Sequence, residues 1–132
     1  MSSRLSQHIR EERGLAYAVF SNLTTYSDAG MVTVYAGCAT EKVSEVVDLT
    51  LQELRELRDV PVPDEELTRA KDHLKGSLML SLENTSSRMS QLARHEIYFG
   101  RSFTLDELLA GIESVSTGDV QRVAGELIQD AN

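Results

Sequence analysis

Residues 15–38 of this 132-residue chain read LAYAVFSNLTTYSDAGMVTVYAGC, and this stretch decides the fold. Aromatic and β-branched residues, which favour strands, are frequent from Leu15 to about Tyr26 and again from Met31 to Cys38. The residues between them, Ser27–Gly30, are typical of a turn. The stretch therefore predicts one antiparallel β-hairpin, and alternation places Tyr17 and Val19 on the same face of its first strand.

Helical patterns flank the hairpin on both sides. The preceding helix is expected from Ser2 to Arg13, with Ser2 or Ser3 as its cap and Gly14 as its end. After the hairpin, apolar residues recur at helical spacing. One helix is expected to begin with Thr40 as its cap, and a second near Asp64. Asn84 marks a kink or break before a helical stretch that ends at Gly100. Two further helices are expected from Thr104, which forms a capping box with Glu107, and from Ser116. The helix from Thr40 should bury a stripe made of Val43, Val46, Val47, Leu51, Leu54 and Leu57.

These elements predict an α+β fold in which an antiparallel hairpin packs against several α-helices. A lone hairpin is marginally stable in water and leaves both strand edges unpaired. We therefore expect the hairpin to be part of a larger antiparallel sheet whose other strands lie in sequence not present here. The chain, residues 1–132, is interpreted as a single, N-terminally truncated domain that pairs with another chain or exposes its strands, and a homo-oligomer is possible.

Composition excludes several classes of protein. The formal net charge is -8, and an acidic surface repels phosphate backbones, so nucleic acid is not an expected partner. No apolar run approaches the roughly 18 residues that a membrane span needs, and no signal-peptide pattern is present. Cys38 is the only cysteine, which excludes an internal disulfide and fits a cytoplasmic location.

The sequence predicts no metal site within this chain. Its three histidines, His8, His73 and His95, are too far apart in sequence for two of them to bind one metal from a helix. Cys38 falls on the apolar face of a predicted strand, where a thiol is usually inert. All three histidines are interpreted as structural or exposed.

One segment, residues 9–17, offers chemistry. Its sequence, IREERGLAY, places Arg10 near the end of a helix and Tyr17 at the start of a strand, with a glycine corner between them. A guanidinium and a phenol that face the same space suit the binding of peptide carbonyls and of a developing oxyanion. In the simpler alternative, the arginine pairs with Glu11 or Glu12 and the tyrosine is half-buried.

The same segment resembles the C-terminal half of insulinase/pitrilysin-type zinc metallopeptidases, in particular the branch of the mitochondrial processing peptidase. The resemblance begins with SSRL at residues 2–5, IRE at 9–11 and RGLAY at 13–17. It continues in order through YAG at 35–37, EEL at 65–67, AK at 70–71, LENT at 82–85, RM at 88–89 and residues 115–120. Nearly the whole chain is covered.

The resemblance implies two homologous α+β halves that close around a peptide. The N-terminal half of such enzymes holds zinc through an H-x-x-E-H motif, which this chain lacks. The C-terminal half supplies an arginine and a tyrosine, seven positions apart, which contact the substrate near the scissile carbonyl. Arg10 and Tyr17 match these positions, whereas Arg13 has the wrong spacing.

The resemblance therefore implies the substrate-binding part of a zinc-dependent metalloendopeptidase, inactive by itself and dependent on a zinc-bearing half or partner subunit. Two alternatives stay open. The chain is either a non-catalytic scaffold or partner subunit of the same fold, or an unrelated helical interaction module.

Overall fold

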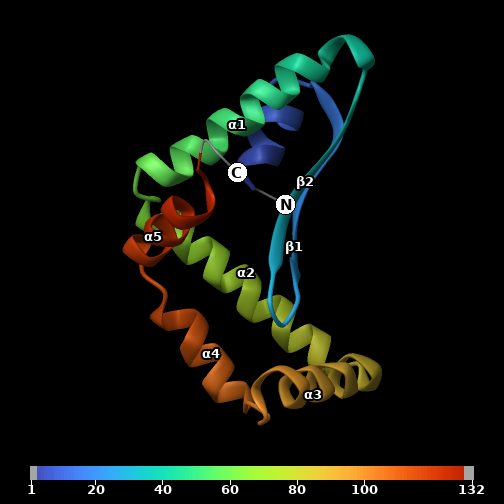
Figure 1. The fold of residues 1–132 in the computed structure, drawn as a ribbon, viewed down its shortest axis with the longest axis vertical. Helices are drawn as coiled ribbons and strands as arrows, with labels where there is room; N and C mark the ends of the chain where they lie inside the picture. Colours follow the sequence, from blue (N-terminus) through green and yellow to red (C-terminus); the bar gives the residue numbers. More distant parts are fainter. Residues whose placement is uncertain (1–2, 130–132) are drawn as a thin grey trace. The chain divides into compact units, whose positions relative to one another are not determined.

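The computed structural model describes residues 3–129 and is rich in helix, with one two-stranded antiparallel sheet (Figure 1). The chain forms two compact units, one with the residues up to Asp59 and from Leu127 onward, the other spanning Val60–Glu126. The elements are η1 (Ser6–Glu11), β1 (Ala16–Thr25), β2 (Gly30–Cys38), η2 (Thr40–Lys42), α1 (Val43–Asp59), α2 (Asp64–Leu82), α3 (Thr85–Phe99), α4 (Leu105–Ser114) and α5 (Thr117–Leu127).

The hairpin forms where the sequence predicts it. β1 and β2 are paired from Thr25 opposite Gly30, next to the turn, to Ala16 opposite Cys38 at the far end. The Tyr26 amide donates a hydrogen bond to the Ala29 carbonyl at 2.8 Å and closes the turn. The described sheet has two strands, so each has an unpaired edge. The α+β prediction is confirmed, and the further strands of a larger sheet stay a prediction.

The hairpin is irregular at one place. Ala16 pairs with Cys38 and Ala18 pairs with Gly37, so two steps along β1 match one step along β2. Tyr17 is the additional residue of this β-bulge. Bulges reorient side chains and are frequent beside active sites.

The helix before the hairpin has an unusual geometry. The Ser3 hydroxyl accepts a hydrogen bond from the Ser6 amide at 3.3 Å, as expected of a cap, whereas Ser2 lies outside the described residues. From Ser6 to Glu11 the helix is a π-helix, a rare form that often occurs at functional sites. Gly14 follows with a φ of 61°, which confirms it as the residue that ends the helical segment.

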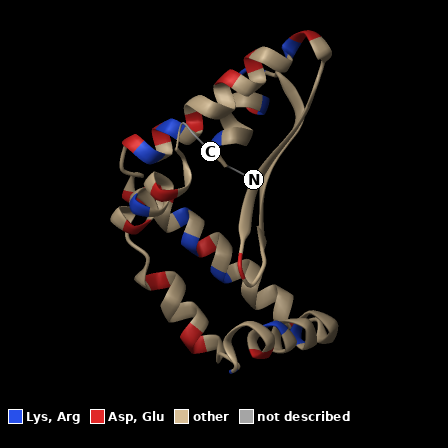
Figure 2. Ribbon diagram, in the orientation of Figure 1, with Lys and Arg blue, Asp and Glu red and all other residues tan. Residues whose placement is uncertain are grey.

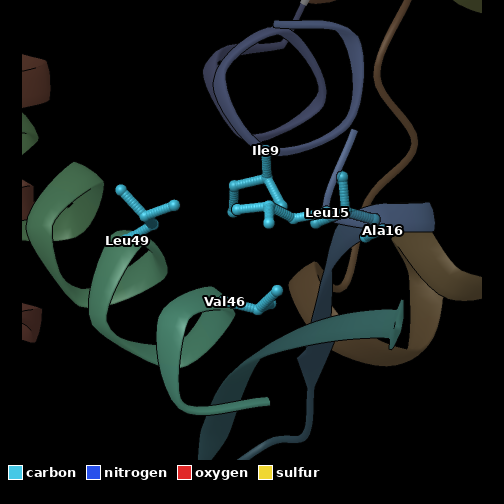
Figure 3. Close-up of a cluster of buried hydrophobic side chains, with 6 residues drawn as sticks. Ile9, Leu15, Ala16, Val46 and Leu49 are labelled. Atoms are coloured by element: carbon cyan, nitrogen blue, oxygen red, sulfur yellow. The ribbon is translucent and has the colours of Figure 1, made fainter. Parts of the chain in front are cut away.

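The core of the first unit lies between η1, the base of the hairpin and α1 (Figure 3). Ile9 is fully buried at its centre, and the side chains around it point toward one another. The buried members of this cluster are Ile9, Leu15, Ala16, Val19, Val46 and Leu49. The cluster fixes η1 and the start of β1 relative to each other.

The buried face of α1 differs from the predicted stripe. Val46, Leu49 and Glu53 are buried, whereas Val43, Val47 and Leu51 are exposed. The helix begins after the short 3-10 turn η2, in which Thr40 is the first residue. The cap position is therefore occupied by Ala39, whose side chain cannot accept a hydrogen bond, and the predicted Thr40 cap does not form. Only the part of α1 that η1 and the hairpin cover is buried. This part is narrower than the whole apolar face of the helix.

The helices of the second unit begin and end at the expected signals. The Asn84 side chain accepts hydrogen bonds from the Ser86 and Ser87 amides, and Gly100 ends α3 with a φ of 64°. Thr104 and Glu107 form the predicted capping box of α4. The Asp119 amide donates to the Ser116 hydroxyl at 3.1 Å, and the Asp119 carboxylate accepts from the Ser116 amide at 3.0 Å.

Candidate functional site

Tyr17 stands on the surface of the hairpin at the bulge. Its side chain is 74% exposed, and its ring covers the backbone of Gly37, where a β-carbon would stand 2.6 Å from the phenol oxygen. Simple alternation places Tyr17 on the same face as Val19, and this interpretation is wrong. Because of the bulge, Ala16 faces the core together with Val19, and Tyr17 lies on the face of Gly37 and Tyr35.

A hydrogen bond to Tyr35 favours the neutral form of the Tyr17 phenol. This bond, followed by the charge interaction with Tyr35, raises the pKa of Tyr17 above its ordinary value of 10.0. The hydroxyl of Tyr17 carries its proton at physiological pH, as that of any ordinary tyrosine does, and the raised pKa extends the neutral form to higher pH. The phenol has a single proton, so a hydrogen bond donated to a substrate oxygen would replace the one to Tyr35.

Two further aromatic residues adjoin Tyr17 on the same face. The rings of Phe20 and Tyr35, a cross-strand pair, stack with centroids 5.0 Å apart. The hairpin surface is almost uncharged, since Asp28 in the turn is the single charged residue from Ala16 to Cys38 (Figure 2). The sequence alone does not predict that Tyr35 and Gly37 are neighbours of Tyr17, because a bulge leaves no clear signal in the sequence.

Arg10 lies on the exposed side of η1, one residue after the buried Ile9. The Gly14 amide donates to the Arg10 carbonyl at 3.1 Å, and the Leu15 amide donates to the Ile9 carbonyl at 2.9 Å. These two bonds lead the chain from η1 directly into β1. Arg10 and Tyr17 thus belong to the same unit, on either side of one tight corner, and both side chains are exposed.

Arg13, the other arginine of the segment, is also exposed, but it lies in the corner after η1 ends at Glu11. The π-helix does not hold it. Arg13 is therefore a natural control for Arg10.

The structure gives two of the three histidines protein partners. Nδ1 of His8 lies 2.5 Å from Oε1 of Glu53, and Nδ1 of His95 accepts a hydrogen bond from the Phe103 amide at 3.4 Å. His73 is exposed on α2. Within residues 3–129, no three His, Cys, Asp or Glu side chains lie close enough together to hold a metal ion. The residues described here therefore do not fit a zinc site.

Cys38 ends β2 and packs, half-buried, against the core cluster of the first unit. A thiol in apolar surroundings is a poor nucleophile. No helix in the described part of the chain is long and apolar enough to cross a bilayer.

The fold and the hairpin site define a class of α+β domain that is known from solved peptidase structures. A crystal structure of a peptidase M16 inactive domain from Pseudomonas fluorescens matches 94% of this chain and 29% of that chain, with a TM-score of 0.83 at 22% identity. A protease from Helicobacter pylori matches 98% of this chain and 31% of that one, with a TM-score of 0.74 at 21% identity. At these identities the likeness shows the fold.

Residues 1–74 match the family described as Peptidase M16 inactive domain, so the chain belongs to this family. Uncharacterized zinc proteases of Streptomyces coelicolor and Bacillus subtilis are similar to it, with 39% and 38% identity over 97% and 98% of this chain. The chain covers only 28% and 32% of those two relatives. The expected resemblance to zinc metallopeptidases is confirmed.

Proposed function

We propose that this chain is the substrate-contacting part of a zinc-dependent metalloendopeptidase, in which Arg10 and Tyr17 bind the peptide next to the bond that is cleaved. The observation that carries the proposal is the placement of Tyr17, which a bulge turns away from the core into solvent. The membership of the chain in a peptidase family supports it.

The two side chains have separate tasks. The Arg10 guanidinium is always charged and offers several donors, so it binds a substrate carbonyl or carboxylate in both the ground state and the transition state. The Tyr17 hydroxyl donates to the substrate oxygen on which negative charge develops. Such a donor contributes most in the transition state.

Zinc would come from outside the residues described here. The relatives are named zinc proteases, but residues 3–129 offer no group of metal ligands. We therefore assign zinc to a zinc-bearing N-terminal half or to a partner subunit, and water activation to that part. The complete peptidase is this chain together with that part. A cytoplasmic location remains a prediction from the single cysteine.

The test is the Tyr17→Phe variant of the complete peptidase, assayed on a fluorogenic peptide. Loss of one oxyanion donor lowers kcat by about 10²–10³-fold with little change in KM. Arg10→Ala is expected to raise KM, because it removes a contact made in the ground state as well. An unchanged kcat in Tyr17→Phe would overturn the assignment.

Two matched variants control for surface changes as such. Tyr26→Phe removes the hydroxyl of another exposed tyrosine, in the hairpin turn, and Arg13→Ala removes the neighbouring arginine. Both are expected to keep kcat and KM within about twofold, as surface substitutions away from a site do.

A non-catalytic scaffold of the same fold is the second candidate function. Complex III2 from Candida albicans contains a chain that matches 96% of this chain and 30% of that one, with a TM-score of 0.83 at 23% identity. A scaffold does not need an exposed Tyr17 at a β-bulge. Two results together would favour the scaffold. The Tyr17→Phe, Arg10→Ala double variant would assemble with its partner as well as the wild type does, and the complete wild-type protein would have no peptidase activity.

A further inference from the structure

A buried acidic residue joins α1 to the helix that carries Arg10. Nδ1 of His8, on η1, lies 2.5 Å from Oε1 of Glu53, on α1. Glu53 is only 7% exposed, and its other oxygen, Oε2, is buried without a hydrogen-bond partner in the part of the chain that the structure describes. A buried carboxylate is costly unless it is paired. The bond to His8 therefore matters more than an ordinary surface contact.

The helix on the other side of this bond needs support from outside. η1 is a π-helix over all six of its residues, and π-helices are rare because their backbone geometry is less favourable than that of an α-helix. Ser6 and Ile9 are the buried residues of η1, and two of its side chains link it directly to the core cluster or to α1. Ile9 is fully buried in the core cluster, and His8 reaches Glu53. Arg10 follows directly after both.

We propose that His8 and Glu53 are positioning residues, whose hydrogen bond fixes the π-helix against α1 and thereby holds Arg10 in place for the substrate. The part that concerns Arg10 rests on the proposed function. The part that concerns the helix stands on the geometry alone. Neither side chain is assigned a contact with substrate.

The bond is strongest when His8 carries a proton, because two opposite charges then meet. The hydrogen bond to Glu53 raises the pKa of His8 above its ordinary value of 6.5, burial opposes this, and the charges of Glu53, Glu12 and Glu56 add to it. Glu12 follows η1, and Glu56 lies on α1. β1, which also packs on η1, has Tyr17 as its one titratable residue.

The sign of the pH effect follows from this direction. A histidine with a raised pKa stabilises the folded form fully below pH 6.5, and the contribution is lost as the pH rises through the pKa in the folded state. The His8 side chain is 38% exposed, so solvent screens the charge. We therefore expect η1 to open more often at pH 8.5 than at pH 6 by about two- to fivefold.

Hydrogen exchange of the amides of residues 6–12, measured by mass spectrometry on the complete peptidase, tests the helix. After correction for the intrinsic pH dependence of exchange, the wild type should show this two- to fivefold rise between about pH 6 and pH 8.5. Glu53→Gln removes the charge and should show no rise. His8→Gln, a milder change at a partly exposed residue, should behave in the same way.

Glu56→Gln is the matched control, since it removes an exposed acid from α1 that makes a weaker contribution to His8. It should keep the rise, and residues 105–114 of α4 should show none in any variant. A pH-independent exchange of residues 6–12 in the wild type, or a rise that persists in Glu53→Gln, would overturn the proposal.

Kinetics test the consequence for Arg10. Relative to the wild type, His8→Gln should raise KM by about two- to fivefold at pH 6 and leave it unchanged at pH 8.5, with kcat within twofold at both. His8→Lys, which keeps a cation across this range, should retain more of the wild-type KM than His8→Gln does. If exchange responds but KM does not, the positioning of the helix holds and the role of Arg10 in substrate binding fails.

Discussion

The ring of Tyr17 lies over Gly37 so closely that a β-carbon at residue 37 would stand 2.6 Å from the phenol oxygen. Real β-carbons do not approach other atoms to this distance. The absence of a side chain at residue 37 is therefore what allows the Tyr17 ring to lie flat across β2. The bulge aims the ring, Gly37 makes room for it, and Tyr35 holds its hydroxyl.

Gly37→Ala should displace the Tyr17 ring without unfolding the chain. The ring is 74% exposed and can swing outward, so the expected loss of stability is below about 1 kcal/mol, less than overpacking costs in a core. If Tyr17 contacts the substrate, kcat should fall by about tenfold or more, since the hydroxyl leaves its place. Thermal unfolding and peptidase kinetics measure the two effects.

Gly30→Ala is the control for adding a methyl group to β2. A β-carbon there would lie 3.5 Å from the Thr24 carbonyl oxygen, an ordinary contact, and neither glycine has a positive φ. A double variant, Gly37→Ala with Tyr17→Phe, should be no slower than Tyr17→Phe alone, because both changes act through one hydroxyl. Additive losses would show that Gly37 acts by another route.

The local signals in the sequence predicted the elements but not the irregularities that form the site. Ser3, Gly14, Asn84, Gly100 and Thr104 mark ends of helices in the structure as the sequence suggests. Such ends are decided by groups a few residues apart. Strict alternation, by contrast, predicts that Tyr17 lies on the same face as Val19. The bulge moves Tyr17 to the opposite face, and it depends on pairing with a strand 20 residues further along the chain.

The buried face of α1 likewise depends on residues that are distant in the sequence. The apolar residues Val47 and Leu51 recur at helical spacing, yet they are exposed, while the acidic Glu53 is buried. Periodicity tells where apolar residues gather on a helix, but the neighbours decide which part of that face is covered. The pairing of Glu53 with His8, 45 residues away, could not be read from either position.

Tyr35→Phe should lower the pKa of Tyr17 toward its ordinary value of 10.0. The hydrogen bond to Tyr35 is the main cause of the raised pKa, and the variant removes it. The neutral form of Tyr17 is favoured in the folded state, so this contribution is complete below pH 10 and is lost as the pH rises through the higher pKa in the folded state. NMR titration with carbon-labelled tyrosine measures the shift. An unchanged pKa would mean that the bond to Tyr35 does not form.

Thr104→Ala should destabilise α4 by about 1 kcal/mol, the usual cost of losing a helix cap. The Thr104 hydroxyl accepts from the Glu107 amide at 3.2 Å, and the Glu107 carboxylate accepts from the Thr104 amide at 2.8 Å. Thr85→Ala is the control, because Asn84 rather than Thr85 caps α3. Hydrogen exchange in residues 105–114 should increase in the first variant and not in the second.

The capping box should also make α4 sensitive to acid. The bond from the Thr104 amide, followed by the bond from Arg101, lowers the pKa of Glu107 below its ordinary value of 4.5. A lowered pKa stabilises the fold above pH 4.5, and the contribution is lost as the pH falls through the pKa in the folded state. Glu107→Gln should therefore speed hydrogen exchange in α4 at pH 7 relative to the wild type. Once the pH falls below the pKa of Glu107 in the folded state, the two proteins should converge.

Ile9→Ala should be the most damaging single change in the first unit. Ile9 is fully buried where η1, the base of the hairpin and α1 meet, and truncating a buried isoleucine costs about 2–5 kcal/mol. Ile9→Val should cost about 0.5–1.5 kcal/mol, since it removes one methylene group. Ile97→Ala, at a residue 77% exposed on α3, should cost less than about 0.5 kcal/mol. If thermal unfolding shows that Ile9→Ala loses no more stability than Ile97→Ala, the cluster around Ile9 does not hold η1 to the hairpin. Arg10 and Tyr17 would then lack a common support.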